Sequence, residues 1–264
     1  MFGLKKKKLP PVARRPTARV RVATPKPHLA GLVYAIGDLH GRLDLFEALL
    51  DAIHSDVDSL AGSEKPTIVL LGDYIDRGPD SAGCVTRVLR LQRESWCVVK
   101  SLKGNHEEAL ALFLDDVEVG PNWIKHGGGA TLQSYGVDLA VAGLAEGWAG
   151  VQEEFRNKLP KEHLAFFKDL KLIYERDDYV FVHAGVRPGV ALEKQLEEDL
   201  LWIRQEFLQV ETPCPGRVIV HGHTPAPSPE LKSGRINVDT GAYASGVLTA
   251  VRLRGFERTI LQAR

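Results

Sequence analysis

Short apolar segments alternate with amphipathic segments in the first part of the chain, and this alternation limits the possible folds most strongly. Apolar runs rich in β-branched residues, typical of buried strands, cover 32–36, 67–71 and 96–102, and apolar residues at helical spacing cover 42–54 and 81–93. Strands and helices that alternate every ~30 residues are typical of βαβ units, in which helices cover a largely parallel sheet. The sequence therefore predicts an α/β fold.

The second half of the chain is predicted to be richer in strands. Strand patterns follow a short helix at 164–170 and cover 172–174, 179–182, 217–220, 235–238, 247–253 and 259–261, with a turn at 175–178. Between the two halves, residues 115–159 hold helical fragments and three consecutive glycines, which indicates a small helical lobe beside the sheet. Because there is no internal repeat and no second core pattern, we predict one domain over residues 31–264.

Residues 1–30 differ in composition from the rest of the chain. They contain nine Lys and Arg, five of the 15 prolines and no acidic residue, whereas residues 31–264 carry a net charge of −9. A like-charged, proline-rich segment buries too little apolar surface to offset the entropy of ordering it. We therefore expect a flexible basic tail. It could contact an anionic lipid or nucleic-acid surface, or lie solvated on the acidic domain.

Composition also excludes some classes of protein. No apolar run approaches the ~18 residues that a transmembrane helix needs, and the basic start is not followed by the apolar stretch of a secretory signal. The three cysteines are too few and too scattered for a disulfide framework or a zinc ribbon. These features predict a cytoplasmic protein without a transmembrane segment.

Side chains that bind metals or move protons follow the predicted strands. Asp38 and His40 come just after the first strand and are two residues apart, so on extended backbone both point the same way while Leu39 points into the core. Asp, Asn or His residues occur in the same way in four later loops, at 72–78, 104–107, 182–185 and 220–225. Ligands of open α/β sheets bind at the carboxyl ends of strands, so we expect these loops to form one site.

Five motifs in these loops resemble those of the phosphoprotein phosphatases in the metallophosphoesterase superfamily, in particular the small bacterial and phage lambda-type serine/threonine phosphatases. The motifs are GDLHG (37–41), GDYIDRG (72–78), GNHE (104–107), HAG (183–185) and HGHT (221–224). The resemblance extends from about residue 33 to residue 254. It implies a β-sandwich flanked by helices, in an α/β/β/α order, with the small helical lobe beside it.

The resemblance also implies two divalent metal ions held by carboxylate, amide and imidazole groups. The implied ligands are Asp38 and His40 for the first ion, Asp73 for both ions, and Asn105, His183 and His223 for the second ion. Oxygen and nitrogen ligands without a thiolate favour Mn²⁺, Fe or Zn²⁺, and we expect Mn²⁺. A hydroxide that bridges the two ions would then attack phosphorus directly, without a phosphoenzyme.

Four further residues receive roles from the resemblance. His106 would be the general acid that protonates the leaving oxygen, and Asp76 would fix its orientation. Arg77 and Arg204 would clamp the phosphate, whose oxygens match the planar fork of a guanidinium group. The predicted activity is hydrolysis of phosphoserine and phosphothreonine in proteins, with phosphotyrosine as a further substrate.

Several alternatives remain open from the sequence. A dinucleoside polyphosphate hydrolase shares the metal motifs, but that branch lacks the Asp-Arg pair of the second motif and has Asp after Asn-His, where this chain has Glu107. An inactive binding module would lack a ligand or His106, and neither is missing. His221 could ligate a metal or only support the site, and Asp239 could support the site or contact substrate, whereas His163 is expected to face solvent.

Overall fold

The computed structural model of the protein describes residues 26–60 and 64–264. The first strand begins at Leu29, two residues before the predicted start of the domain. Most of the predicted basic tail lies outside the described residues, and its predicted contact with an anionic surface therefore stays a prediction.

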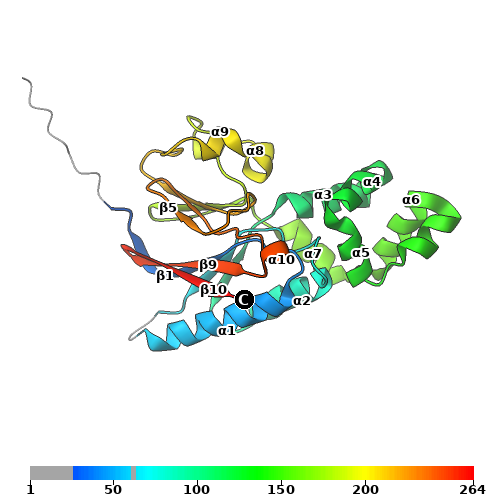
Figure 1. Cartoon of the computed structure of the whole chain (residues 1–264), viewed down its shortest axis with the longest axis horizontal. Helices are drawn as coiled ribbons and strands as arrows, with labels where there is room; N and C mark the ends of the chain where they lie inside the picture. Colours follow the sequence, from blue (N-terminus) through cyan, green and yellow to red (C-terminus); the bar gives the residue numbers. More distant parts are fainter. Residues whose placement is uncertain (1–25, 61–63) are drawn as a thin grey trace, which may run out of the picture.

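Two five-stranded sheets form the centre of the described chain (Figure 1). The first has the order β10-β9-β1-β2-β3, with bounds β1 (Leu29–Ile36), β2 (Thr67–Leu70), β3 (Val98–Ser101), β9 (Leu248–Gly255) and β10 (Glu257–Ala263). The second has the order β4-β5-β6-β8-β7, with bounds β4 (Ile173–Arg176), β5 (Tyr179–Val182), β6 (Val218–His221), β7 (Glu230–Leu231) and β8 (Arg235–Asn237). Strands β1, β2 and β3 are parallel, and so are β5, β6 and β8.

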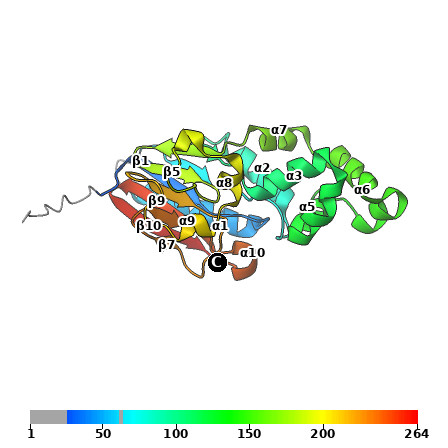
Figure 2. The same cartoon turned by 90° about the horizontal axis from the view of Figure 1, so that it is seen from above.

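Helices lie outside the sheets and in a lobe at one end of the molecule. Those next to the sheets and loops are α1 (Leu43–Ser59), α2 (Ser81–Leu91), α3 (Asn105–Asp115), α7 (Lys161–Asp169), η3 (Leu192–Lys194), α8 (Glu197–Trp202), α9 (Gln205–Leu208) and α10 (Ala242–Ser245). The lobe contains η1 (Val117–Val119), α4 (Gly120–Trp123), η2 (Ile124–Gly128), α5 (Gly129–Ser134) and α6 (Leu139–Lys158). Figure 2 shows α5 and α6 at the end of the molecule away from the sheets.

Alternation of side chains along the strands produces the layered packing. In β1, Val33 and Ala35 pack in the core between the two sheets, whereas Tyr34 and Ile36 pack in the core that contains the apolar faces of α1 and α2. In the second sheet, the outward side chains of β5 and β6 pack with residues of α8 and α9. The order is therefore helix, sheet, sheet, helix, which confirms the predicted α/β/β/α sandwich.

The lobe shares its apolar core with the sheet side of the molecule. Phe113, Trp123 and Phe155 are buried in the same cluster as the apolar faces of α1 and α2. The ring centroids of Phe113 and Trp123 lie 5.1 Å apart, and those of Trp123 and Phe155 lie 6.1 Å apart. Continuous aromatic packing thus joins the lobe to the sandwich.

Some local predictions were wrong. The turn predicted at 175–178 is shorter, because β4 continues to Arg176 and pairs with Tyr179 at the start of β5. The sequence analysis also missed β7 and the short helices α8, α9 and α10, which are too short for a periodic pattern. His163 is buried, not exposed, because its two ring nitrogens lie 2.8 Å from the Tyr135 hydroxyl and 3.2 Å from the Thr86 hydroxyl.

No helix among residues 26–60 and 64–264 has both the length and the apolar character required to cross a membrane.

We predict that Phe181→Ala destabilises the fold by about 3–5 kcal/mol, because Phe181 is fully buried between the sheets and its removal leaves a cavity there. Urea denaturation followed by circular dichroism measures this free energy. Phe256→Ala is the matched control, since Phe256 is 62% exposed, and it should cost less than ~1 kcal/mol. Equal losses in the two variants would contradict the assignment of Phe181 to the inter-sheet core.

Candidate active site

The predicted site residues lie in loops after the parallel strands of both sheets. Asp38 and His40 follow β1, Asp73 follows β2, Asn105 and His106 follow β3, His183 follows β5 and His223 follows β6. Contacts between the loops bring these carboxyl ends together, because the amide of His223 donates to Asp38 and the ring of His183 bonds to the carbonyl of Leu71. Residues far apart in the sequence therefore share one buried site.

The carboxylate of Asp73 lies between two groups of imidazoles. Its Oδ2 atom is 3.5 Å from His40 Nε2 and 3.9 Å from His106 Nε2, and its Oδ1 atom is 3.5 Å from His183 Nε2. Each oxygen thus faces a different group of ring nitrogens. This is the geometry that a carboxylate bridging two ions requires.

Asn105 joins the second group of imidazoles. Its Oδ1 atom lies 2.9 Å from His183 Nε2 and 2.8 Å from His223 Nδ1, and these two nitrogens are 3.2 Å apart. Three donor atoms with separations near 3 Å match the edge of a coordination shell whose metal–ligand distances are about 2.0–2.2 Å.

Backbone carbonyls orient two of the histidine rings. His40 Nδ1 lies 2.8 Å from the carbonyl of Ile75, and His183 Nδ1 lies 2.9 Å from the carbonyl of Leu71. A carbonyl accepts only from a protonated nitrogen, so the Nε2 atom of each neutral ring presents a lone pair to the site. Burial lowers the pKa of His40 to about 3 and that of His223 to about 2, and it also lowers the pKa of His183, which keeps these rings neutral.

These observations fit a pair of divalent ions. Two sets of donors each lie within 4.8 Å of one another, namely His40, Asp73 and His106, and Asp73, His183 and His223. In the described part of the chain, the buried atoms His223 Nε2 and Asp239 Oδ2 have no hydrogen-bond partner. Burial alone raises the pKa of Asp73, but the surrounding imidazoles outweigh it and hold the pKa of that carboxyl well below its usual range. Neutral imidazoles beside an ionised carboxylate are the forms that bind metals.

Asp38 lies outside these two groups of close donors. Its two oxygens accept from the amide of His223 at 3.3 and 3.1 Å, and it belongs to neither group of close donors. Its pKa is raised by burial and by the neighbouring carboxylates Asp239 and Asp73. Several buried carboxylates that raise one another's pKa in this way favour a site that receives cations.

His106 forms a short contact with Asp76 at the edge of the site. The ring Nδ1 atom lies 2.6 Å from Asp76 Oδ2, which leaves Nε2 directed toward Asp73. Burial alone lowers the pKa of His106, but Asp73 and then Asp76 outweigh it, so that the pKa is raised. The predicted pairing of His106 with Asp76 is thus present as a buried contact.

The two predicted arginines contact different residues at the site. Arg77 lies beside the donor group that contains His40. Its guanidinium is 2.8 Å from His40 Nε2 and lies over the ring of Tyr243. Arg204 donates to the hydroxyl of Thr224, and its charge lowers the pKa of both His183 and His223. Neither arginine forms an ion pair with a carboxylate in residues 26–60 and 64–264, so both are available for an anion.

Sequence reasoning missed Glu107 and two residues of the lobe. The buried carboxylate of Glu107 accepts from the amides of Asp73, Tyr74 and Gly104, and it thereby ties two site loops together. Trp123 and Thr131 both donate to Asp76. The sequence signal was the position of Glu107 within GNHE, but nothing near the lobe residues indicated a contact with Asp76.

Other polar residues lie beside the site without joining it. His221 packs against the ring of Phe207 and is in neither group of close donors, which favours support over ligation. Asp239 is buried and accepts from the amide of Gly241. Trp202 is 45% exposed, donates to Glu108 and faces the His223 ring at a centroid distance of 6.2 Å.

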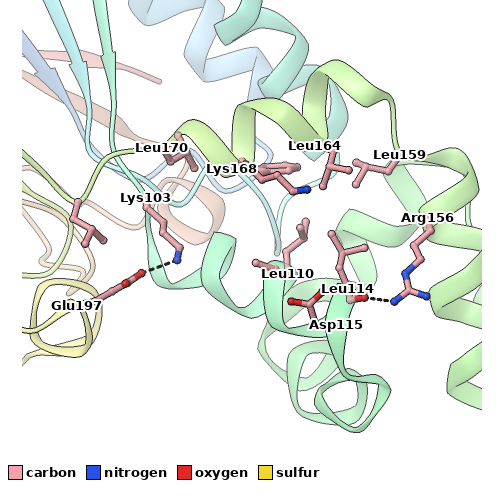
Figure 3. Close-up of a pocket in the computed structure, with 13 residues that line it drawn as sticks. Lys103, Leu110, Leu114, Asp115, Arg156, Leu159, Leu164, Lys168, Leu170 and Glu197 are labelled. Atoms are coloured by element: carbon pink, nitrogen blue, oxygen red, sulfur yellow. Dashed lines mark hydrogen bonds and ion pairs between the residues drawn. The ribbon is translucent and has the colours of Figure 1, made fainter.

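A cavity of about 700 Å³ lies apart from these residues, between α3 and α7 (Figure 3). Leucines and Phe167 form its apolar walls, and Lys103, which pairs with Glu197 at 2.7 Å, lies at its edge. None of the ten predicted site residues lines this cavity. It is therefore separate from the candidate active site.

Comparison with known proteins agrees with this geometry. A model of the family described as calcineurin-like phosphoesterase matches residues 31–244. Serine/threonine-protein phosphatase 1 of Salmonella typhimurium is 27% identical over 84% of this chain and 92% of its own length. The asymmetrical bis(5'-nucleosyl)-tetraphosphatase of Oceanobacillus iheyensis is 25% identical over 82% of this chain and 86% of its own. The crystal structure of a putative diadenosine tetraphosphatase has a TM-score of 0.61 at 21% identity, and the match covers 90% of this chain and 96% of that one. This structural match supports the fold.

We predict that Asp73→Asn lowers the affinity for both metal ions by at least ~10-fold, because each oxygen of Asp73 faces a different donor group. Elemental analysis after dialysis against a limiting metal concentration measures the number of ions retained. Asp44→Asn, which alters an exposed ion pair with Arg42, is the control and should leave the metal content unchanged. Retention of both ions by Asp73→Asn would argue against the bridging role.

Proposed function

The chain belongs to the calcineurin-like phosphoesterase family, and from this we propose that it is a metal-dependent serine/threonine protein phosphatase with two metal ions. Its substrates would be phosphoserine and phosphothreonine side chains of proteins, and phosphotyrosine would be a further one. Three cysteines without a disulfide partner support a reducing, cytoplasmic setting for this activity.

The residues that would hold the ions are the six ligands predicted from the sequence, and the close donors around Asp73 support this assignment. Asp38 and His40 would serve one ion, Asn105, His183 and His223 the other, and Asp73 both. Oxygen and nitrogen donors favour Mn²⁺, with Fe or Zn²⁺ as alternatives. Bound there, the two ions would activate a water molecule and neutralise charge on the phosphoryl oxygens.

The observation that carries the proposal is the buried pair of His106 and Asp76. Hydrolysis of a serine or threonine ester expels an alkoxide, which is a poor leaving group and gains a factor of about 10²–10⁴ from a positioned proton donor. His106 Nε2 faces the site while Asp76 fixes Nδ1 at 2.6 Å, so the ring is held in one orientation. His106 would deliver its proton from Nε2 to the departing oxygen.

Arg77 and Arg204 would orient the phosphate. They approach the two donor groups from different sides, and each has a guanidinium without a carboxylate partner within the described ranges. A phosphate between them would receive planar, charge-assisted hydrogen bonds. Arg77 would then exchange its contact with His40 for a contact with substrate.

Dinucleoside polyphosphate hydrolysis is the second candidate, because relatives of similar identity have that name. Its leaving group is a nucleotide phosphate, which departs as a stable anion and needs little protonation. A buried acid held by a carboxylate is of little use to that reaction but of much use for alkoxide departure, which favours the protein phosphatase.

We predict that His106→Asn lowers kcat on a phosphoserine peptide by about 100-fold or more and leaves both metal ions bound, because the acid is lost while the six proposed metal ligands remain. Steady-state assays with added Mn²⁺, together with elemental analysis, measure the two effects. A kcat equal to that of the wild-type enzyme in His106→Asn would show that His106 is not the general acid.

We further predict that the wild-type enzyme hydrolyses a phosphoserine peptide with a higher kcat/KM than diadenosine tetraphosphate. Side-by-side rates on these two substrates and on a phosphotyrosine peptide, each with Mn²⁺, measure the order of preference. A faster reaction with diadenosine tetraphosphate would select the second candidate.

A further inference from the structure

The turn that carries Asp76 and Arg77 has strained backbone. Both residues have positive φ angles, of 72° and 69°, in the left-handed region that is unfavourable for a non-glycine residue. Such a turn persists only if its surroundings hold it in place. Most of the residues that hold it come from the lobe, a part of the chain that supplies none of the predicted site residues.

Thr131 of α5 contacts both the backbone and the side chain of Asp76. Its hydroxyl donates to Asp76 Oδ1 at 2.5 Å and accepts from the amide of Asp76 at 2.9 Å. The hydroxyl of Ser81 accepts from the same amide at 3.0 Å and lies 3.0 Å from that of Thr131. All three residues are buried, so water does not replace these bonds.

Trp123 of α4 holds the other oxygen of the same carboxylate. Its indole N–H donates to Asp76 Oδ2 at 2.8 Å, and the same oxygen contacts His106 Nδ1 at 2.6 Å. The indole is 1% exposed and packs against Phe113 and Phe155. The position of this donor is therefore set by the aromatic core of the lobe.

Gly127 completes the contact with the turn. Its carbonyl accepts from the amide of Arg77 at 3.1 Å. Its φ of 112° is a conformation that glycine adopts without steric strain. A Cβ atom at this position would lie 2.6 Å from Arg77 Cγ and 2.8 Å from Arg77 N. The glycine run of the lobe thus allows α4 and α5 to close over the turn.

We propose that Trp123 and Thr131 are positioning residues for the general acid, acting through Asp76. This inference rests on the proposed role of His106. A carboxylate rotates easily about its last torsion, so one bond to His106 alone does not fix its direction. Donors on both oxygens fix that rotation, and Asp76 then holds the His106 ring so that Nε2 points at the leaving oxygen. The lobe is in this way a part of the catalytic apparatus.

The test compares variants that remove one donor with minimal change of shape. Thr131→Val and Trp123→Phe each delete a donor to Asp76, and Thr131→Ser restores the hydroxyl. Tyr135→Phe is the matched control, because it deletes a part-buried hydrogen bond of the lobe, to His163, that does not involve Asp76. Each variant is assayed with Mn²⁺ on a phosphoserine peptide and on p-nitrophenyl phosphate, whose leaving group departs without a proton.

We expect Thr131→Val and Trp123→Phe each to lower kcat on the phosphoserine peptide by about 10-fold, with KM little changed. On p-nitrophenyl phosphate the loss should be below ~3-fold, since that reaction does not use the acid. Thr131→Ser should recover most of the peptide activity. Equal losses on both substrates, or losses as large in Tyr135→Phe, would show a merely structural role and overturn the proposal.

A second measurement keeps this inference separate from the proposed function. The proton between His106 Nδ1 and Asp76 should give a strongly downfield proton resonance in the wild-type protein, assigned by its loss in His106→Asn. It should shift or broaden in Thr131→Val and Trp123→Phe and stay unchanged in Tyr135→Phe. An unchanged resonance in the first two variants overturns the proposal, whatever substrate the enzyme prefers. If phosphoserine is not a substrate while the resonance responds as expected, only the proposed function fails.

Discussion

The arrangement of the site depends on one buried carboxylate, that of Asp73. Its two oxygens face imidazoles from different strands of both sheets, and its backbone is fixed as well, since its carbonyl accepts from the amides of Leu39 and His40. Glu107 holds the Asp73 amide from the other side. Gly104 passes so close that a Cβ there would lie 2.1 Å from Asp73 Oδ1. The loops after β1, β2 and β3 therefore converge on Asp73 as one unit.

Backbone strain is concentrated around the same carboxylate. Among the described residues, six non-glycine residues have positive φ angles, and five of them are in the site: His40, Asp73, Asp76, Arg77 and His223. Each of these backbone conformations is unfavourable. Buried hydrogen bonds from the sandwich and the lobe to the same turns offset this conformational free energy. The strain turns side chains that follow β1, β2 and β6 into one small volume, which regular extended backbone would not do. The residues of the site thus adopt backbone conformations that non-glycine residues normally disfavour.

Sequence reasoning predicted the site better than its surroundings. Asp38, Asp73, Asn105, His183 and His223 follow apolar strands, and strand ends of parallel sheets meet in space, so residue type and strand order together indicated their convergence. The apolar run at 32–36 indicated a buried strand, whereas the two layers on which β1 packs were implied only by the family resemblance. The contacts of Trp123 and Thr131 had no such signal, because a hydrogen bond between a lobe helix and a loop some 50 residues earlier leaves no periodic trace. Short elements such as α10 and β7 were not predicted for a similar reason, since they depend on tertiary contacts and not on intrinsic propensity.

The proposed division of roles within the site gives a reason why relatives of this chain have names for different substrates. In the proposed function, the donor groups around Asp73 would act on the phosphoryl oxygens, which every phosphate ester and anhydride has, so these groups would not by themselves select a substrate. Only the group that meets the leaving oxygen distinguishes an alkoxide from a nucleotide phosphate. In this chain the proposed proton donor, His106, contacts Asp76, and Asp76 accepts hydrogen bonds from residues of the lobe. If His106 has the proposed role, substrate preference depends less on the metal donors, which the motifs mark clearly, than on a segment whose composition indicated only a helical lobe.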